Sequence, residues 1–236
     1  MFLNINDDAI FIADSHIQKN RDALIGKLNQ INKTSQIIFL GDISNLFVGG
    51  IKSSEKINEE LIKCIKNLQS QIIYFEGNHD FNLKNTLDSA NIKIIPRENQ
   101  PALAQYKDKM ILLAHGDIFL NKKYECYIKM LTSKKIIAFL GYLDFISKGK
   151  IFNMINKKVS AKAIKYPYNI DSIINRRIYV YKNYIQSLNV KIDMVIEGHF
   201  HIGRIIENRD FVYVAMPSFY HNAKIFDIKN KQFKTI

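Results

Sequence analysis

Residues 9–16 read AIFIADSH, an apolar and β-prone run that ends directly on two potential metal ligands, Asp14 and His16. The same design recurs in residues 37–42 (IIFLGD), 72–80 (IIYFEGNHD), 110–117 (MILLAHGD) and 192–201 (IDMVIEGHFH). Each run predicts a buried strand. Polar residues that follow neighbouring parallel strands meet at one edge of a sheet. We therefore expect one site at five strand ends, holding five of the chain's six histidines.

The first 118 residues alternate strand signals with helical ones. Between the strands lie helical patterns such as residues 57–68, where apolar residues recur at spacings of three and four. This order is typical of α/β proteins. After residue 190, the segments 203–206, 211–215 and 224–228 are predicted to form an antiparallel tail of strands. With 236 residues and 47% apolar content, the chain suits one domain with a sizeable insertion.

Residues 119–190 differ from the rest in charge and in pattern. Helices are predicted over 124–131, 136–146, 151–163 and 170–188, and lysines alternate there with apolar and aromatic residues. This segment holds fourteen basic and three acidic residues, a net +11 of the chain's +12. We interpret it as a basic helical cap inserted into a core made of 1–118 and 191–236. An ordinary packed helical subdomain with a solvated lysine face is an equally open and compatible interpretation.

The sequence also bears on the cellular compartment. Residues 1–12 carry Asp7 and Asp8 but no basic residue, so they lack the charged start of a signal peptide. No apolar stretch approaches the ~18 residues that a membrane span needs. The two cysteines, Cys64 and Cys126, lie in helical sequence far from the histidines and are predicted to be buried free thiols. We therefore expect a cytoplasmic protein.

The strand-end residues form a mixed set of carboxylates, imidazoles and one amide. This set suits Mn²⁺, Fe²⁺ or Zn²⁺ better than Ca²⁺ or Mg²⁺, and the lack of thiolates argues against a closed structural zinc site. Seven candidate ligands are too many for one ion. They suit two ions that lie ~3.5–4 Å apart and share a bridging carboxylate. The preferred metal is Mn²⁺, with Fe²⁺ or Zn²⁺ as alternatives.

In content and order, the five motifs resemble the signature of the calcineurin-like metallophosphoesterases. The resemblance covers residues 8–118 and 191–228, and it implies an α/β (α+β) four-layer α/β/β/α sandwich, here with an inserted helical cap. It implies that one ion binds Asp14, His16, Asp42 and His201, and that the other binds Asp42, Asn78, His115 and His199. Asp42 would bridge the ions, and a hydroxide held between them would attack phosphorus in line.

The resemblance also implies catalytic roles for two neighbouring residues. Asn78 would contact a phosphate oxygen, and His79 would give a hydrogen bond or a proton to the phosphate or leaving group. The family often reads Gly-Asp-x-x-Asp, whose second Asp orients this histidine, but the corresponding residue here is Asn45. An amide stabilises an imidazolium far less than a carboxylate does. His79 is therefore either a general acid or mainly an electrostatic contact.

Three further polar residues near the motifs receive no direct role. His221 follows Pro217-Ser218-Phe219-Tyr220, and a structural role is favoured for it. Asp80 and Asp117 follow motif histidines and are expected to orient or cap their neighbours rather than bind metal.

Within the family, the chain is similar to the bacterial UDP-2,3-diacylglucosamine pyrophosphohydrolases of lipid A synthesis, where a helical lid lies between the His-Gly-Asp and Gly-His-x-His motifs. Tyr124 and Tyr127 after His115-Gly116-Asp117, and Ser160-Ala161-Lys162, echo that subfamily. In Gly77-Asn78-His79-Asp80-Phe81, histidine replaces the arginine of its best-known branch, which indicates a divergent branch or another substrate.

The resemblance implies hydrolysis to UMP and 2,3-diacylglucosamine 1-phosphate. The substrate contacts expected are Asn78, His79, Ser160, Lys162 and Lys165. The expected partners are an amphiphilic nucleotide-sugar lipid and, through the basic cap, the inner face of the cytoplasmic membrane, where each lysine would contribute ~1 kcal/mol. No stable nucleic-acid partner is expected.

Two other functions fit the sequence. A soluble metallophosphodiesterase could use the +11 segment to hold a nucleotide or nucleic acid. The lysines of residues 119–190 are interleaved with apolar residues and are not clustered in a polar arm, which disfavours this alternative. A dimetal fold could also be retained as a protein-binding scaffold with the cap as its interaction surface. A scaffold needs no complete ligand set, so the seven ligands disfavour that hypothesis.

Overall fold

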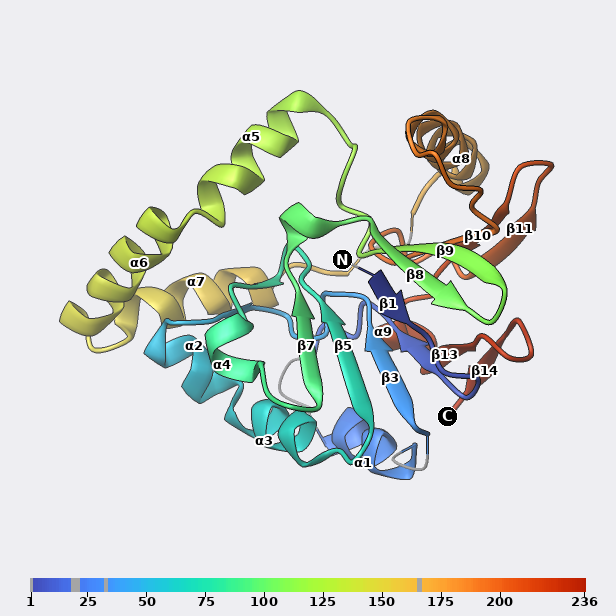
Figure 1. The fold of residues 1–236 in the computed structure, drawn as a ribbon. Helices are drawn as coiled ribbons and strands as arrows, with labels where there is room; N and C mark the ends of the chain where they lie inside the picture. The colour runs from blue at the N-terminus through green and yellow to red at the C-terminus, as the bar shows by residue number, and fades with distance from the viewer. Residues whose placement is uncertain (1, 18–21, 32–33, 165–166) are drawn as a thin grey trace.

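The computed structural model describes residues 2–17, 22–31, 34–164 and 167–236, and it is built on two six-stranded sheets (Figure 1). The first sheet has the order β1 (Phe2–Asn4), β8 (Ala102–Tyr106), β9 (Lys109–Ala114), β10 (Met194–Glu197), β12 (Val212–Ala215), β11 (Arg204–Glu207). The second has the order β14 (Gln232–Thr235), β13 (Lys224–Asp227), β2 (Ile10–Ile12), β3 (Gln36–Phe39), β5 (Gln71–Phe75), β7 (Ile92–Ile95). A small third pair joins β4 (Phe47–Val48) and β6 (Asp80–Phe81).

The five strands predicted to carry the site are confirmed, and they run in register. β2, β3 and β5 pair in parallel in the second sheet, and β9 pairs in parallel with β10 in the first. The predicted antiparallel tail is correct for β11 and β12. β13 is also an antiparallel strand, but it crosses to the second sheet and pairs with β2 and β14, so the tail does not stay together, and β12 runs parallel to β10. Hydrophobic runs reveal a strand but not its sheet, because both sheets bury the same kind of face.

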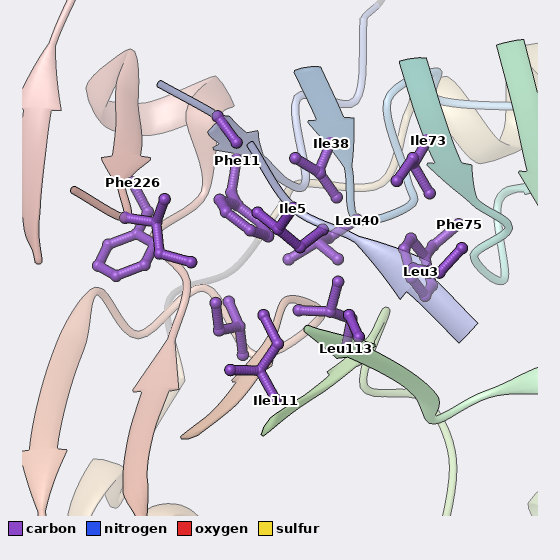
Figure 2. Close-up of a cluster of buried hydrophobic side chains, with 14 of the residues drawn as sticks. Leu3, Ile5, Phe11, Ile38, Leu40, Ile73, Phe75, Ile111, Leu113 and Phe226 are labelled. Carbon is purple, nitrogen blue, oxygen red and sulfur yellow. The ribbon is translucent and has the colours of Figure 1, made fainter. Parts of the chain in front are cut away.

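The main core lies between the two sheets, where alternate side chains of facing strands meet (Figure 2). Ile38 and Ile73 of the second sheet point toward the layer that contains Leu113 of the first. Since successive strand residues point to opposite faces, the remaining apolar residues of each strand face outward and need helices to cover them.

Helices supply those two outer layers. On the second sheet, α1 (Asp22–Gln30) and α3 (Glu59–Asn67) bury Leu28 and Ile65 against a cluster that includes Phe39. On the first sheet, α8 (Ile170–Gln186) buries Ile174 and Tyr181 in a cluster on β9, β10 and β12. Figure 1 shows α8 over β9 and β10 and α1 and α3 on the far side of the other sheet. The expected four-layer α/β/β/α sandwich is confirmed.

Three further helices project from one end of the sandwich: α5 (Lys122–Leu131), α6 (Lys134–Ile146) and α7 (Lys150–Ser160) (Figure 1). We call them the cap helices. Asn121 and Ser133 begin α5 and α6 by accepting backbone N–H bonds from Tyr124 and Ile136. Gly149, at φ 81°, turns the chain into α7. The cap helices pack on α2 (Lys52–Ile57), β4 and β6 through a small cluster that includes Phe152.

All four helices predicted within residues 119–190 are present, but they pack against different parts of the fold. The cap helices form one projecting group, whereas α8 completes the sandwich as the outer layer of the first sheet. The division into a core of 1–118 and 191–236 and a cap of 119–190 stays a prediction. Short helices at Lys84–Leu87 (α4), Arg97–Asn99 (η1) and Phe219–Asn222 (α9) complete the elements.

The prediction for the cysteines was only partly right. Both thiols are free, but Cys64 is half-buried and Cys126 is exposed on α5. An apolar neighbourhood in sequence does not bury a residue on a helix that packs along only one side. Among the described helices, none combines the length and apolar character needed to cross a bilayer.

Candidate metal centre

The predicted ligands converge where five strands end. Asp14 and His16 follow β2, and Asp42 follows β3. Asn78 and His79 follow β5, His115 follows β9, and His199 and His201 follow β10. Their ligand atoms form three groups within 4.8 Å: Asp14, His16, His201; His16, Asp42, His79; and Asp42, His115, His199.

These groups agree with the expected pair of ions in one important respect. Asp42 belongs to two groups, and its Oδ2 lies 3.9 Å from His16 Nε2 and 3.5 Å from His115 Nε2. On the His16 side, His201 Nε2 lies 3.3 Å from Asp14 Oδ1. On the His115 side, the ring of His199 lies 5.1 Å away, centroid to centroid. A carboxylate between two ligand clusters is placed as a bridging ligand must be.

The backbone of these loops is unusual at the ligands themselves. A left-handed φ occurs at Asp14 (53°), His16 (40°), Asp42 (53°), His199 (67°) and His201 (55°). Such a conformation costs about 1–3 kcal/mol per residue and persists only where the surroundings impose it. The strain turns successive side chains toward one point instead of opposite faces of a strand.

Two glycines make room for this crowding. A Cβ on Gly41, itself at φ 79°, would lie 2.5 Å from His115 Nδ1. A Cβ on Gly77 would collide with the Asp42 carboxylate. The glycines of the Gly-Asp and Gly-Asn-His motifs are therefore needed for close approach between loops from different strands.

The ligand atoms fit a cation, as the hydrogen bonds of His115 show. Its Nδ1 lies 2.8 Å from the Leu40 carbonyl, which only accepts, so Nδ1 carries the proton. In the neutral ring Nε2 then presents a lone pair to two acceptors, Asn78 Oδ1 at 3.2 Å and Asp42 Oδ2. Within the described part of the chain, buried Asp14 Oδ1 and His16 Nδ1 have no hydrogen-bond partner. Divalent cations would satisfy these converging acceptors.

Burial and neighbouring charges act differently on the individual ligands. Burial lowers the pKa of His115 and His201, but the Asp42 carboxylate raises that of His115 well above its usual value, and a hydrogen bond with Asp14 raises that of His201. Burial, with a smaller contribution from neighbouring histidines, lowers the pKa of His16 and of His199 to about 4, so both rings are neutral at pH 7. Burial alone would raise the pKa of Asp42, but the surrounding histidines hold it well below its usual value. Neutral imidazole and ionised carboxylate are the forms that bind metal.

Asp80 holds the loops around Asp42 in place. This agrees with the expectation that it orients its neighbours and does not bind metal. Its Oδ1 accepts from the backbone N–H groups of Asp42 (2.8 Å) and Gly77 (2.9 Å). Its Oδ2 accepts from Ile43 N–H (2.7 Å) and the Tyr74 hydroxyl (2.6 Å). One buried carboxylate thus joins the loops after β3 and β5.

A buried arginine connects the loop after β9 to the cap. Arg97 donates from Nε to Asp117 Oδ2 at 2.6 Å and from its two terminal nitrogens to Glu125 on α5 at 2.9 and 3.0 Å. Asp117 is therefore an ion-pair partner and not a candidate ligand. Sequence reasoning missed Arg97 because it lies in the short helix after β7, twenty residues from Asp117, with no local signal.

A second missed arginine supports the Gly198–His201 loop. Arg177 on α8 donates to both oxygens of Glu197, at 2.9 and 2.7 Å, and to the Ile118 carbonyl at 2.8 Å. Its guanidinium also lies 5.1 Å from the Phe200 ring centroid. Glu197 is the residue directly before Gly198, so α8 anchors the loop that carries His199 and His201.

The structure corrects the expected role of Asn45. Its backbone carbonyl, not its side-chain amide, lies 2.7 Å from His79 Nδ1 and accepts the proton there. The Asn45 side chain instead donates to Ser160 Oγ on α7 at 2.9 Å. His79 is also held by its own N–H, which donates to Asp42 Oδ1 at 2.8 Å. The imidazole ring is thus oriented by a backbone carbonyl instead of a carboxylate, with Nε2 left for chemistry.

The remaining predicted contacts fall in different places. Asn78, His79 and Lys162 line one cavity of about 450 Å³, whose walls also include Tyr124 and Tyr127. Ser160 lines a separate, more polar cavity with Asn45. Lys165 lies outside the described residues. The ring of His221 lies 6.2 Å from that of His201, at the edge of the cluster and in no ligand group found among the described residues.

The arrangement suits hydrolysis at phosphorus. Two bound divalent ions would supply Lewis-acid stabilisation of phosphate charge and lower the pKa of a water molecule toward 7. Asp14, His16, Asp42 and His201 would hold one ion, and Asp42, Asn78, His115 and His199 the other. The chain itself contributes the Asn78 amide and the His79 ring beside the place where a phosphate would bind.

Comparisons with known proteins agree with this chemistry. The model of the family described as calcineurin-like phosphoesterase matches residues 9–203. A search of curated proteins found no similar sequence.

Several solved structures are similar to this chain at low sequence identity. A novel archaeal phosphodiesterase is 16% identical, with 97% of this chain and 98% of that chain covered and a TM-score of 0.46. A phosphoesterase from E. coli is 10% identical, with 96% of each chain covered and a TM-score of 0.44. Phosphopantetheinyl hydrolase from Mycobacterium tuberculosis is 11% identical, with 89% of each chain covered and a TM-score of 0.39. None of these likenesses bears on the substrate.

The family match spans most of the chain and includes the strand-end motifs from Asp14 to His201. This chain therefore belongs to the calcineurin-like phosphoesterase family and is a metal-dependent hydrolase.

Proposed function

We propose that the protein is a dimetal pyrophosphohydrolase that cleaves UDP-2,3-diacylglucosamine to UMP and 2,3-diacylglucosamine 1-phosphate. One observation carries the proposal: an apolar cavity of about 450 Å³ under the cap helices has Asn78 and His79 in its wall. A phosphate at the metal centre would therefore have an apolar chamber next to it. Such a chamber suits the acyl chains of a lipid substrate.

The composition of the cavity suits acyl chains. Aliphatic side chains from the β4 region and the cap helices form much of its wall, among them Leu46, Val48, Leu131, Leu140, Ile155 and Val159. Burying methylene groups there would contribute roughly 0.8 kcal/mol each. The volume lies within the ~300–1,000 Å³ range of small-molecule sites.

The polar members of the wall suit the phosphate end of the same substrate. Asn78 would contact a phosphate oxygen, and His79 would give a hydrogen bond or proton to the leaving group. The Lys162 ammonium would meet a phosphate charge, and Lys165 is a further candidate contact. When water attacks the α-phosphorus, UMP keeps that phosphorus and the diacylglucosamine 1-phosphate leaves on an oxygen whose charge its own phosphate group stabilises. A His79 that lacks a carboxylate partner would suffice for such a leaving group.

We propose Mn²⁺ as the native metal, with Fe²⁺ or Zn²⁺ as alternatives, because the ligands are imidazoles, carboxylates and an amide. Titration with each ion and measurement of turnover will decide among them. The ion that gives the highest turnover at micromolar concentration should be Mn²⁺.

The cap helices also carry a surface that suits a membrane. On α6, Phe139, Tyr142, Phe145 and Ile146 are 56, 61, 72 and 57% exposed, and their spacing places them on one face. Lysines are exposed on α6, on α7 and in the turn between them: Lys134, Lys135, Lys148, Lys150, Lys157 and Lys158. Exposed aromatic residues with flanking lysines are typical of helices that lie in the interface of anionic membranes. We propose peripheral attachment to the cytoplasmic face of the membrane, where the substrate resides.

Vesicle co-sedimentation tests this attachment. Replacing Phe139 and Phe145 with serine should weaken binding to vesicles that contain anionic phospholipid. Tyr179→Ser on α8 is the matched control, because Tyr179 is 65% exposed but lies outside the cap helices. Equal binding by both variants would contradict the proposed surface.

A soluble metallophosphodiesterase that acts on a nucleotide or nucleic acid is the second candidate. The exposed lysines of the cap helices favour it, because they could bind a polyanion such as nucleic acid in the same way as an anionic membrane. Its signature would be salt-sensitive binding to nucleic acid together with slow turnover of the lipid.

Release of UMP from UDP-2,3-diacylglucosamine in detergent micelles with Mn²⁺ tests the lead proposal. We expect turnover that Asp42→Ala abolishes. Hydrolysis of a small phosphodiester without any UMP release from the lipid would reject the lipid substrate while leaving the dimetal chemistry intact.

A further inference from the structure

Ser160 was expected to touch substrate, but its hydrogen bond points elsewhere. Its Oγ accepts from Asn45 Nδ2 at 2.9 Å, a contact between residues 115 positions apart in sequence. Ser160 is the last residue of α7, and Asn45 lies in the loop between β3 and β4. This bond therefore ties the end of a cap helix to the loop beside the metal centre.

Asn45 contacts Ser160 and His79 through different groups. Its side-chain amide reaches Ser160, while its backbone carbonyl accepts from His79 Nδ1 at 2.7 Å. The three residues thus form a continuous series from α7 through Asn45 to the imidazole. Among the described residues, the Asn45 carbonyl oxygen is the only acceptor found for His79 Nδ1. A rotation of this peptide would therefore turn the imidazole ring and change the direction of Nε2.

The same end of α7 also shapes the proposed substrate chamber. Val159 and Lys162, on either side of Ser160 in sequence, line the cavity that includes His79. Leu46, the neighbour of Asn45, lines both this cavity and the polar one that contains Ser160. The Asn45–Ser160 bond therefore lies where the cap and the catalytic loop form a common wall.

We propose that Ser160 is a positioning residue: through Asn45 it couples the placement of cap helix α7 to the orientation of His79. This rests on the role proposed above for His79. In that step a water molecule gives a proton to solvent, its oxygen bonds to phosphorus, and the bond from phosphorus to the leaving oxygen breaks. That oxygen takes a proton or a hydrogen bond from His79 Nε2. An asparagine at position 45 suits this device, because its amide donates to the cap while its carbonyl still orients the ring.

Leaving-group dependence separates positioning from a merely structural role. Methyl phenyl phosphate and methyl 4-nitrophenyl phosphate share the reacting phosphodiester but differ in how much the departing oxygen needs His79. Ser160→Ala and Asn45→Ala, which keeps the backbone carbonyl, should each lower kcat more on the phenyl ester. The extra loss should be about twofold to tenfold, the effect of one hydrogen bond. Ser160→Thr should restore most of it, and the double alanine variant should lose no more than either single one.

Matched variants make the result decisive. Ser147→Ala removes another cap hydroxyl, which donates to the Asp144 carbonyl at 3.3 Å, and should affect both esters equally. His79→Ala should show the same preference for the good leaving group as Ser160→Ala, only larger. Equal losses on both esters for Ser160→Ala, or additive losses in the double variant, would overturn the inference. No leaving-group preference in His79→Ala would overturn the role of His79 and the inference with it, whatever the lipid assay shows.

Discussion

Replacing Arg177 tests how α8 holds the loop that carries His199 and His201. Its side chain is 2% exposed and donates three hydrogen bonds, two to the Glu197 carboxylate and one to the Ile118 carbonyl. Arg177→Met keeps the volume but leaves a buried carboxylate without its counter-ion. Removing one partner of a buried ion pair costs about 3–5 kcal/mol. Glu197 retains hydrogen bonds from the Tyr181 and Tyr213 hydroxyls, so we expect the lower part of that range.

Urea unfolding in the presence of a chelator measures this cost without a contribution from bound metal. In thermal unfolding under the same conditions, the melting temperature should fall by roughly 6–15 °C, at about 2–4 °C per kcal/mol for a chain of this size. Arg177→Met with Glu197→Gln should recover part of the loss, because the uncompensated charge is gone. Arg176→Met is the control, since this neighbour is exposed and donates to the Leu120 carbonyl. A cost below about 1 kcal/mol, or additive costs in the double variant, would refute the reasoning.

Three further predictions follow from the site. Gly41→Ala places a Cβ 2.5 Å from His115 Nδ1 and should lower bound metal and hydrolysis at least tenfold, as metal analysis and a phosphodiester assay would detect; a variant with full metal content would contradict the packing argument. Chelation should abolish hydrolysis, and Mn²⁺ at 100 times its Kd should raise the melting temperature by roughly 5–10 °C, from about 2.7 kcal/mol of linkage; an unchanged melting curve would mean that no ion binds the folded chain tightly. Val159→Phe should narrow the cavity under the cap and raise KM for an acylated substrate more than for a small diester, and equal effects would argue against the cavity as an acyl site.

Much of the site could be predicted because its signals are local. Each ligand motif ends a run such as AIFIA or MILLA, and a run of this kind forms a buried strand wherever it lies in the fold. Parallel neighbours then bring their ends together without any further information. The edge strands β1 and β14, and β8 next to β1, were not predicted, since short, partly exposed strands lack such a run.

What could not be predicted depends on distant partners or on backbone direction. Arg97 and Arg177 each pair with a carboxylate about twenty residues away, and an arginine on a helix is more often a solvated residue than a buried one. The role of Asn45 was missed because a backbone carbonyl, which every residue has, orients His79. Ser160 was assigned to substrate by resemblance, whereas its position at the end of α7 places it against Asn45.

The central claim is that Asp42 lies between two metal ions, and the stoichiometry of Mn²⁺ binding tests it most directly. Calorimetric titration of the metal-free protein should show two ions per chain, and Asp42→Ala should weaken both sites because it removes a ligand from each. Saturation of the unaltered protein by a single ion, or an Asp42→Ala variant that keeps one site at full affinity, would contradict the account.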